Sequence, residues 1–353
     1  MWKRLLSWFF VFGVVFYSCN PVFAKTTEEE LAQLKSQQGR GILGNWSDRI
    51  HISGVVEVEA YYQDYADDAA GIDTDSSDID LTNVELSIDA DIAKYVGGYL
   101  LLKYEGDDVF VDEGTINLGG VEDMPFYLTA GKFCVPFGVF NSHFISDPIT
   151  LEIGEINEGA VALGYANDYF DIALGVFNGD IDETASDDVI ENFVASAAFT
   201  PPLPFDDSSI SFGVSYTSSI AEAGGLEDEF TVIEDYVGAL SLFASASYKN
   251  LTFEVEYVGA LDEFQVGELI AARESKPMAC NFELAYAVND KLEVAGRYEF
   301  SDELWDLLPE EQYGPVVSYS LFENTTLAIE YLHGEYENGD ARDVVTAQLT
   351  IEF

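Results

Sequence analysis

The sequence predicts an all-β fold: a transmembrane antiparallel β-barrel of about 16 strands with a short N-terminal helical segment. Three observations lead to this prediction. Segments of about ten residues alternate apolar and polar side chains, which is the period of a strand and a length that crosses a bilayer when tilted. The number of such segments is even. The connections between them alternate between tight and long, as in a closed bacterial barrel.

The first residues have the features of an export signal. Lys3 and Arg4 supply a positive end, an apolar core follows, and Ala24 is the small residue at the expected cleavage point. We therefore expect residues 1–24 to be a signal peptide. Lipoprotein processing at Cys19 is the alternative, which the bulky aromatic residues before it disfavour.

The rest of the chain divides into two parts. We expect residues 25–49 to be a short periplasmic helix and linker, and residues 50–353 to be the outer-membrane β-barrel. Thr27 and Glu30 fit a capping box for a helix over 26–38. Its apolar stripe is short, so a coiled coil that helps subunits associate, as in a homo-oligomer, and a frayed helix both stay open.

The alternation predicts the strands one by one. The expected ranges are 50–62, 79–92, 94–105, 108–119, 125–133, 159–167, 169–178, 189–200, 208–219, 235–248, 250–261, 276–288, 290–301, 312–322, 324–336 and 342–353.

The connections favour a barrel over a secreted β-sandwich. The tight set includes single-residue and two-residue turns, whereas the long set includes 63–78, 134–158, 179–188, 220–234 and 262–275. Short periplasmic turns opposite longer outer loops are typical of outer-membrane barrels. A sandwich has no reason to alternate so regularly.

The last strand shows how the faces are assigned. Val345, Leu349, Ile351 and Phe353 lie on one face of 342–353, and polar side chains lie on the other. In lipid the apolar face must point outward, because a charge there costs about 2–4 kcal/mol at mid-membrane. This predicts an integral outer-membrane protein in contact with lipid and lipopolysaccharide, with a C-terminal strand that the barrel-assembly machinery binds.

The charge excludes some functions. The formal net charge of −50 makes nucleic acid an improbable partner and suits cations. The chain has only three histidines and neither a Gly-x-Ser-x-Gly nor a His-Glu-x-x-His motif, so we expect no enzyme. We expect no cofactor and no metal centre. Pairing of Cys134 with Cys280 stays open, since an oxidising compartment permits a disulfide.

The polar faces of the strands converge on a lumen in which acids outnumber bases. Such an excess of carboxylates in a water-filled pore predicts a preference for cations. The alternative is that these residues only keep the lumen wet. The charged side chains expected inside are Glu57, Glu59, Glu85, Asp89, Asp91, Lys103, Asp171, Glu254, Glu256, Glu283, Glu293, Arg297, Glu299, Glu330 and Glu352.

Segment 134–158 is the longest predicted loop and contains more apolar residues than a free surface loop would carry. Since these residues need a surface to pack against, we expect the loop to fold against the inner wall; an outer loop folded on itself is the alternative. It would then line the narrowest zone with His143, Asp147, Glu152, Glu155 and Glu158.

Two further predicted outer loops, 63–78 and 179–188, are rich in aspartate. Calcium binding is conceivable because hard cations take carboxylate oxygens. Neither segment matches the twelve-residue calcium loop, so a solvated acidic rim is the favoured interpretation.

Several segments resemble the LbtU family of siderophore porins. They are Ser77–Leu86, Tyr127–Gly138, Ile145–Glu155, Val176–Asp182, Glu256–Asp262 and Val344–Phe353. The resemblance implies a 16-stranded outer-membrane barrel, preceded by a coiled-coil segment, that takes up an iron–siderophore.

Energised siderophore receptors carry a plug domain, and we expect residues 25–49 to be too short to form one. The function predicted from the sequence is therefore plug-independent facilitated diffusion of a ferric siderophore. A general cation-selective diffusion porin and, less favoured, an acidic surface or adhesin barrel stay open.

Overall fold

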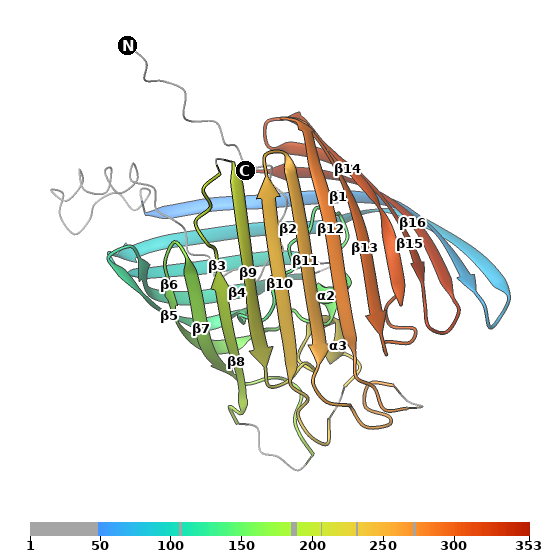
Figure 1. Ribbon diagram of the computed structural model, residues 1–353, viewed down its shortest axis with the longest axis horizontal. Helices are drawn as coiled ribbons and strands as arrows, with labels where there is room; N and C mark the ends of the chain where they lie inside the picture. The colour runs from blue at the N-terminus through green and yellow to red at the C-terminus, as the bar shows by residue number, and fades with distance from the viewer. Residues whose placement is uncertain (1–48, 106–107, 185–188, 206, 231, 271–272) are drawn as a thin grey trace.

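The computed structural model describes residues 49–105, 108–184, 189–205, 207–230, 232–270 and 273–353. Within them, sixteen antiparallel strands form one closed barrel in which each strand pairs with its neighbours in sequence and β1 pairs with β16 (Figure 1). This confirms the predicted fold class. The predicted signal peptide and N-terminal helical segment lie outside the described residues.

The elements follow one another around the barrel. The strands are β1 (Ile50–Asp67), β2 (Ile72–Ala93), β3 (Val96–Glu105), β4 (Asp108–Val121), β5 (Met124–Cys134), β6 (Asn157–Ala166), β7 (Phe170–Phe177), β8 (Asn192–Phe199), β9 (Ser208–Thr217), β10 (Ala239–Tyr248), β11 (Leu251–Ala260), β12 (Met278–Asn289), β13 (Leu292–Asp302), β14 (Glu311–Phe322), β15 (Thr325–Glu335) and β16 (Ala341–Glu352). Two one-turn helices, α2 (Ile149–Glu152) and α3 (Gly224–Glu227), lie in loops.

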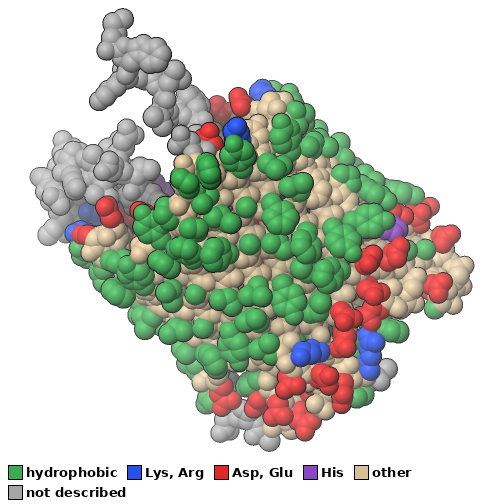
Figure 2. Space-filling model, in the orientation of Figure 1, with side chains coloured by type: hydrophobic (Ala, Val, Ile, Leu, Met, Phe, Trp, Pro, Cys, Tyr) green, Lys and Arg blue, Asp and Glu red, His purple; other side chains and the backbone are tan. Residues whose placement is uncertain are grey.

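The two faces of each strand differ as the alternation predicts. On β13, Val294 and Tyr298 are exposed on the outside, whereas Ala295, Arg297 and Glu299 are buried on the inside. Apolar side chains cover much of the outer surface, and acidic side chains gather along the edge of that band (Figure 2). Because only an apolar exterior is stable in lipid, this surface matches a barrel that spans a membrane.

The barrel closes at a seam between its first and last strands. The register runs from Val55 opposite Glu352 to Ala66 opposite Ala341. Beyond it, the N–H of Gly54 donates to the carbonyl of Phe353 at 2.9 Å, and the N–H of Phe353 donates to the carbonyl of Gly54 at 3.0 Å. The last residue therefore takes part in closure.

The connections alternate as predicted, with tight turns at one end of the barrel and longer loops at the other. We call these the turn end and the loop end. One predicted loop is wrong: most of 63–78 belongs to the β1–β2 hairpin, which turns only at residues 68–71. Both faces of this extension are polar, so the sequence lacked the apolar alternation that marks a strand. Pairing with β1 continues nonetheless, and Tyr62 donates to Asp75 across the strands at 2.7 Å.

The largest apolar cluster lies among the loops, toward the loop end. Loop side chains such as Phe140, Ile153, Leu226, Phe264 and Leu304 are fully or almost fully buried in it, together with small residues on the inner faces of β6, β10, β11 and β12. The loops therefore share one core that partly fills the barrel. Among the described residues, no helix is long and apolar enough to cross a bilayer.

We predict that Gly54→Leu weakens the seam. A Cβ at this position would lie 2.6 Å from the Phe353 ring and 2.7 Å from the Glu85 carbonyl oxygen, so the end of the seam must move. We expect a loss of about 1–3 kcal/mol. It would be seen as a lower midpoint of the heat-dependent mobility shift that folded barrels show in detergent gels.

Gly159→Leu is the matched control, because a Cβ at Gly159 would meet nothing within 4 Å. Equal midpoints for the two variants would contradict this account of the seam.

Candidate functional site

Residues 135–156, which connect β5 to β6, turn into the barrel and are called here the lumen loop. The N–H of Gly138 donates to Ser215 Oγ on β9 at 2.9 Å. The N–H groups of Val139 and Phe140 both donate to the carboxylate of Glu256 on β11, at 2.9 and 2.6 Å. The loop is therefore fastened to the inner wall soon after it leaves β5.

Further carboxylates hold the middle of the loop. The N–H of His143 donates to Glu283 at 2.6 Å, that of Ile145 to Glu330 at 2.7 Å, and that of Ile149 to Glu299 at 2.7 Å. Apart from the single turn of α2, this segment has little secondary structure to satisfy its N–H groups, and buried donors without partners are costly. Glutamates on β11, β12, β13 and β15 supply the missing acceptors.

Arg297 on β13 is the centre of this arrangement. Its side chain is fully buried and lies 2.9 Å from Glu283 and 3.7 Å from Glu299. It also donates to Ser142 Oγ at 2.5 Å and to the carbonyl of Ser146 at 2.9 Å. One guanidinium, with its five donors in a rigid fork, thus binds the wall carboxylates and the loop together.

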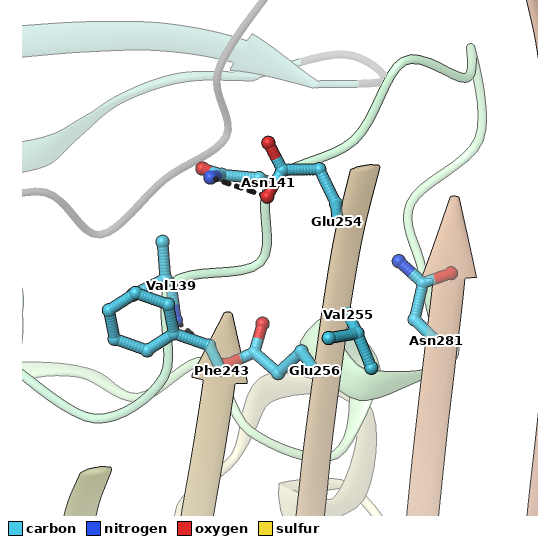
Figure 3. A pocket seen from close by; sticks show the side chains of 7 residues that line it. All are labelled: Val139, Asn141, Phe243, Glu254, Val255, Glu256 and Asn281. Atoms are coloured by element: carbon cyan, nitrogen blue, oxygen red, sulfur yellow. Dashed lines mark hydrogen bonds between the residues drawn. The ribbon is translucent and has the colours of Figure 1, made fainter. Parts of the chain in front are cut away.

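Figure 3 shows where the first part of the loop meets the wall. Val139 and Asn141 of the loop face Glu254 and Glu256 of β11, with Phe243 of β10 beside them. Asn141 donates to Glu254 at 3.4 Å, which adds a weaker contact to the two strong ones at Glu256.

These contacts correct the predicted surroundings of several charged side chains. Glu57, Glu256, Glu299, Glu330 and Arg297 were expected to line a water-filled pore, but each is at most 4% exposed. Four of the five are covered because the lumen loop uses them as hydrogen-bond partners. Glu57 is covered by Asn83 and Thr350, which donate to it at 3.2 and 3.2 Å.

Other predicted lumen charges keep contact with solvent. Glu59, Glu85, Asp89 and Lys103, on β1 to β3, are half-buried and lie on a different part of the wall from the carboxylates that hold the loop. Glu254 and Glu293 are half-buried beside the loop itself.

The predicted loop residues have different positions. Asp147 keeps contact with solvent, but desolvation inside the barrel raises the pKa of its carboxyl group. Glu59 and Glu330 add to this rise, whereas Arg297 and Lys103 oppose it. Since these charges belong to both sides of the barrel, Asp147 lies between the two walls. His143 Nδ1 lies 2.9 Å from Glu293 Oε1. Burial acts to lower the pKa of His143, but the hydrogen bond to Glu293 and nearby carboxylates outweigh it, so the pKa is raised.

Three predicted loop acids lie nearer the loop end. Burial and the repulsion of Asp147 and Glu299 raise the pKa of Glu152 to about 7. The carbonyl of Glu155 accepts a hydrogen bond from Gly224. Glu158 lies in β6 rather than in the loop, and the charges that act on it include Asp180 and Glu227, which corrects its assignment to the narrowest zone.

Glu222, between β9 and β10, was not predicted. It is 1% exposed and accepts hydrogen bonds from the N–H groups of Asp180 and Ile181 at 2.9 and 3.3 Å, so it joins two outer loops. Burial raises its pKa to about 7, although the two hydrogen bonds oppose this. A Cβ on Gly179 would lie 2.1 Å from the Glu222 carboxyl carbon, so the glycine is the signal that could have revealed this contact.

No metal centre or disulfide is found in the described part of the chain. No group of three or more His, Cys, Asp or Glu side chains within the described ranges is placed to hold a metal ion. Cys134 and Cys280 are not joined by a disulfide. Pairing of the two cysteines, which the sequence left open, does not occur in this structure.

Comparison with known sequences finds distant relatives. No protein-family model matches the chain. A UPF0422 protein of Coxiella burnetii is 24% identical over 276 residues, which cover 73% of this chain and 59% of the relative. A UPF0422 protein of Legionella pneumophila strain Philadelphia 1 is 25% identical over 330 residues, with 78% and 62% covered. The chain thus spans about three fifths of the length of these relatives.

Comparison with solved structures finds porins. The anion-selective porin from Comamonas acidovorans matches with a TM-score of 0.59 at 14% identity, covering 86% of this chain and 99% of that one. OprB of Pseudomonas putida matches with a TM-score of 0.61 at 10% identity, covering 86% and 94%. Salmonella typhi OmpF matches with a TM-score of 0.55 at 10% identity, covering 86% and 97%. The barrel therefore has a porin fold.

We predict that Arg297→Met loosens the lumen loop. The change leaves buried Glu283 and Glu299 without their cation, and breaking a buried pair in this way costs about 3–5 kcal/mol. Chymotrypsin should then cut at Phe140 or Phe144 faster than in the unaltered protein. Lys249→Met, at an exposed turn, is the control. Equal cleavage rates in all three proteins would show that Arg297 does not hold the loop.

Glu222 predicts a pH dependence of stability. Its folded-state pKa of about 7 lies above the ordinary value of 4.5, so the folded protein binds more protons between these values. Stability should therefore fall as pH rises from about 4.5 to 7, by roughly 2–3 kcal/mol from this group, and then level off.

Glu222→Gln should remove the part of the stability loss that the titration of Glu222 causes. We expect the variant to match the unaltered protein near pH 4.5 and to unfold at a higher temperature near pH 8. Identical pH profiles would contradict the assignment.

Proposed function

We propose that the chain is an outer-membrane diffusion channel whose passage runs between the lumen loop and the wall formed by β16 and β1 to β4. The observation that carries this proposal is the loop fastened inside a porin-type barrel by buried carboxylates. A loop held in this way narrows the lumen without adding a paired strand that would close it. The passage of a solute therefore depends on the side chains that the loop turns toward the lumen.

The charge of the lumen determines which ions the channel prefers. Asp147 is exposed on the loop, and Glu59, Glu85 and Asp89 face the lumen from the other side, with Lys103 among them. Although several predicted lumen acids are buried, acids still outnumber bases among these exposed and half-buried groups. A carboxylate excess in a wet constriction favours cations.

The finer proposal is facilitated diffusion of a ferric siderophore through this lumen, without a plug. It is supported by the sequence resemblance to LbtU family siderophore porins over segments that include Tyr127–Gly138 and Ile145–Glu155. Both segments extend into the lumen loop, where a cargo would pass. A general cation-selective porin is the second candidate, favoured by the charge of the lumen alone.

Planar bilayer recording of the purified protein tests the channel. We expect open, cation-selective channels, and we expect Asp147→Asn to lower the cation-to-anion permeability ratio by about two- to fivefold, since it removes the exposed charge of the loop. Asp73→Asn, near the tip of the exposed outer hairpin and on its outward face, is the control. No conductance from a folded barrel would contradict both transport proposals and favour a surface structure.

Ferric siderophores added to the same bilayers separate the two transport candidates. Block of the current by one ferric siderophore at low concentration, but not by its iron-free form, would support specific uptake. Open channels indifferent to every siderophore tried would leave a general cation-selective porin.

A further inference from the structure

One sector of the inner wall carries almost no charge. Along β8, β9 and β10 the inward positions in the half nearer the turn end are mainly serine and alanine. They include Ser196, Ala198, Ser209, Ser211 and Ser245. This hydroxyl wall differs from the acidic wall that begins at β11, and cation passage does not require it.

A cavity of about 410 Å³ lies between the hydroxyl wall and the first part of the lumen loop. Gly138 and Asn141 line it from the loop, Tyr127 from β5, and Asp171 from β7. This volume is within the range of small-molecule sites, which is about 300–1,000 Å³.

An aromatic ring forms part of the cavity lining. Phe243 of β10 lies against the backbone of Gly213 on β9, where a Cβ would be 2.5 Å from its Cε1 atom. Gly213 thus allows the ring to lie close to the wall, and Val139 of the loop lines the same pocket as the ring (Figure 3). The face of such a ring is partly negative and attracts the polarised C–H groups of a ligand.

Hydrogen-bonding groups surround this ring, and no lysine, arginine or histidine is among the described residues that line the cavity. Tyr127 donates to Asp171 at 3.1 Å, and Ser245 donates to Glu254 at 2.8 Å, which orients both pairs. Asn141 also donates to Glu254. The hydroxyl of Ser196 makes no hydrogen bond to any described residue and can serve a ligand as donor or acceptor.

We propose that this cavity binds one neutral, ring-shaped polyhydroxylated solute of monosaccharide to disaccharide size. Ring C–H groups would lie on Phe243, and hydroxyl groups would pair with Asp171, Ser196 and Asn141. The carboxylates of Asp171 and Glu254 exclude anions, and the hydroxyl groups would be left unpaired by an apolar solute. The site goes beyond the proposed channel function, because binding here does not depend on conduction.

Isothermal titration of the full chain in detergent with D-glucose tests the proposal. We expect saturable binding with a dissociation constant of roughly 1–10 mM, as suits so small a ligand. Betaine, a water-soluble solute without hydroxyl groups, should not bind. Phe243→Leu, which keeps the apolar volume but removes the aromatic face, and Ser196→Val should each weaken glucose binding about tenfold.

Ser318→Ala is the matched control, since Ser318 faces inward from β14 and does not line the cavity. Glucose binding that both cavity variants weaken and the control leaves unchanged would support the site. No binding up to about 100 mM glucose, equal binding of betaine, or binding that neither variant alters would overturn it. If Phe243→Leu or Ser196→Val does not fold, Ser196→Ala is measured in its place.

Conductance measured on the same preparation separates the two proposals. Open channels without glucose binding would refute only the solute site, whereas glucose binding by a barrel that does not conduct would refute only the channel.

Discussion

The interior of this barrel depends on hydrogen bonds from loop N–H groups to strand carboxylates. Hydrogen bonds from N–H groups to charged carboxylates belong to a class that contributes about 1.5–3 kcal/mol each. Glu256, Glu283, Glu299 and Glu330 each accept at least one from the lumen loop. Arg297 offsets the repulsion that this buried negative charge would otherwise create. A segment with little regular structure thereby gains a fixed course across the lumen.

That course gives different roles to three sectors of the inner wall. Strands β11 to β15 anchor the loop and lose most of their contact with water. Strands β8 to β10 present small hydroxyl side chains across a cavity. Strands β16 and β1 to β4 stay open and carry acids that include Glu59, whose charge acts on Asp147. The position of one loop therefore decides which lumen carboxylates act as structural acceptors and which can attract a passing ion.

The barrel could be predicted from the sequence because each strand has a recognisable local pattern. A period of two, with an apolar face toward lipid, is imposed by the membrane on every strand, and the turns between strands are short enough to read directly. The alternation of apolar and polar residues is absent beyond the membrane. The hairpin around Ile72–Asp78 is polar on both faces, so its sequence resembled that of a loop.

The interior could be predicted only in part, because its contacts join residues far apart in sequence. The apolar content of the lumen loop correctly indicated that it packs against something. Alternation also placed Glu299 and Glu330 on the inside, but it could not show that the loop would cover them. The apolar core among the outer loops, with Leu226 and Phe264, was missed for the same reason.

The most direct test is whether position 147 lies in the ion path. In a background without Cys134 and Cys280, an Asp147→Cys protein would be treated with a positively charged thiol reagent during bilayer recording. The account predicts rapid labelling with a stepwise fall in cation current, and no labelling of a Thr150→Cys protein, because Thr150 is fully buried. Labelling at 147 that leaves the current unchanged would contradict the claim that the lumen loop forms the constriction.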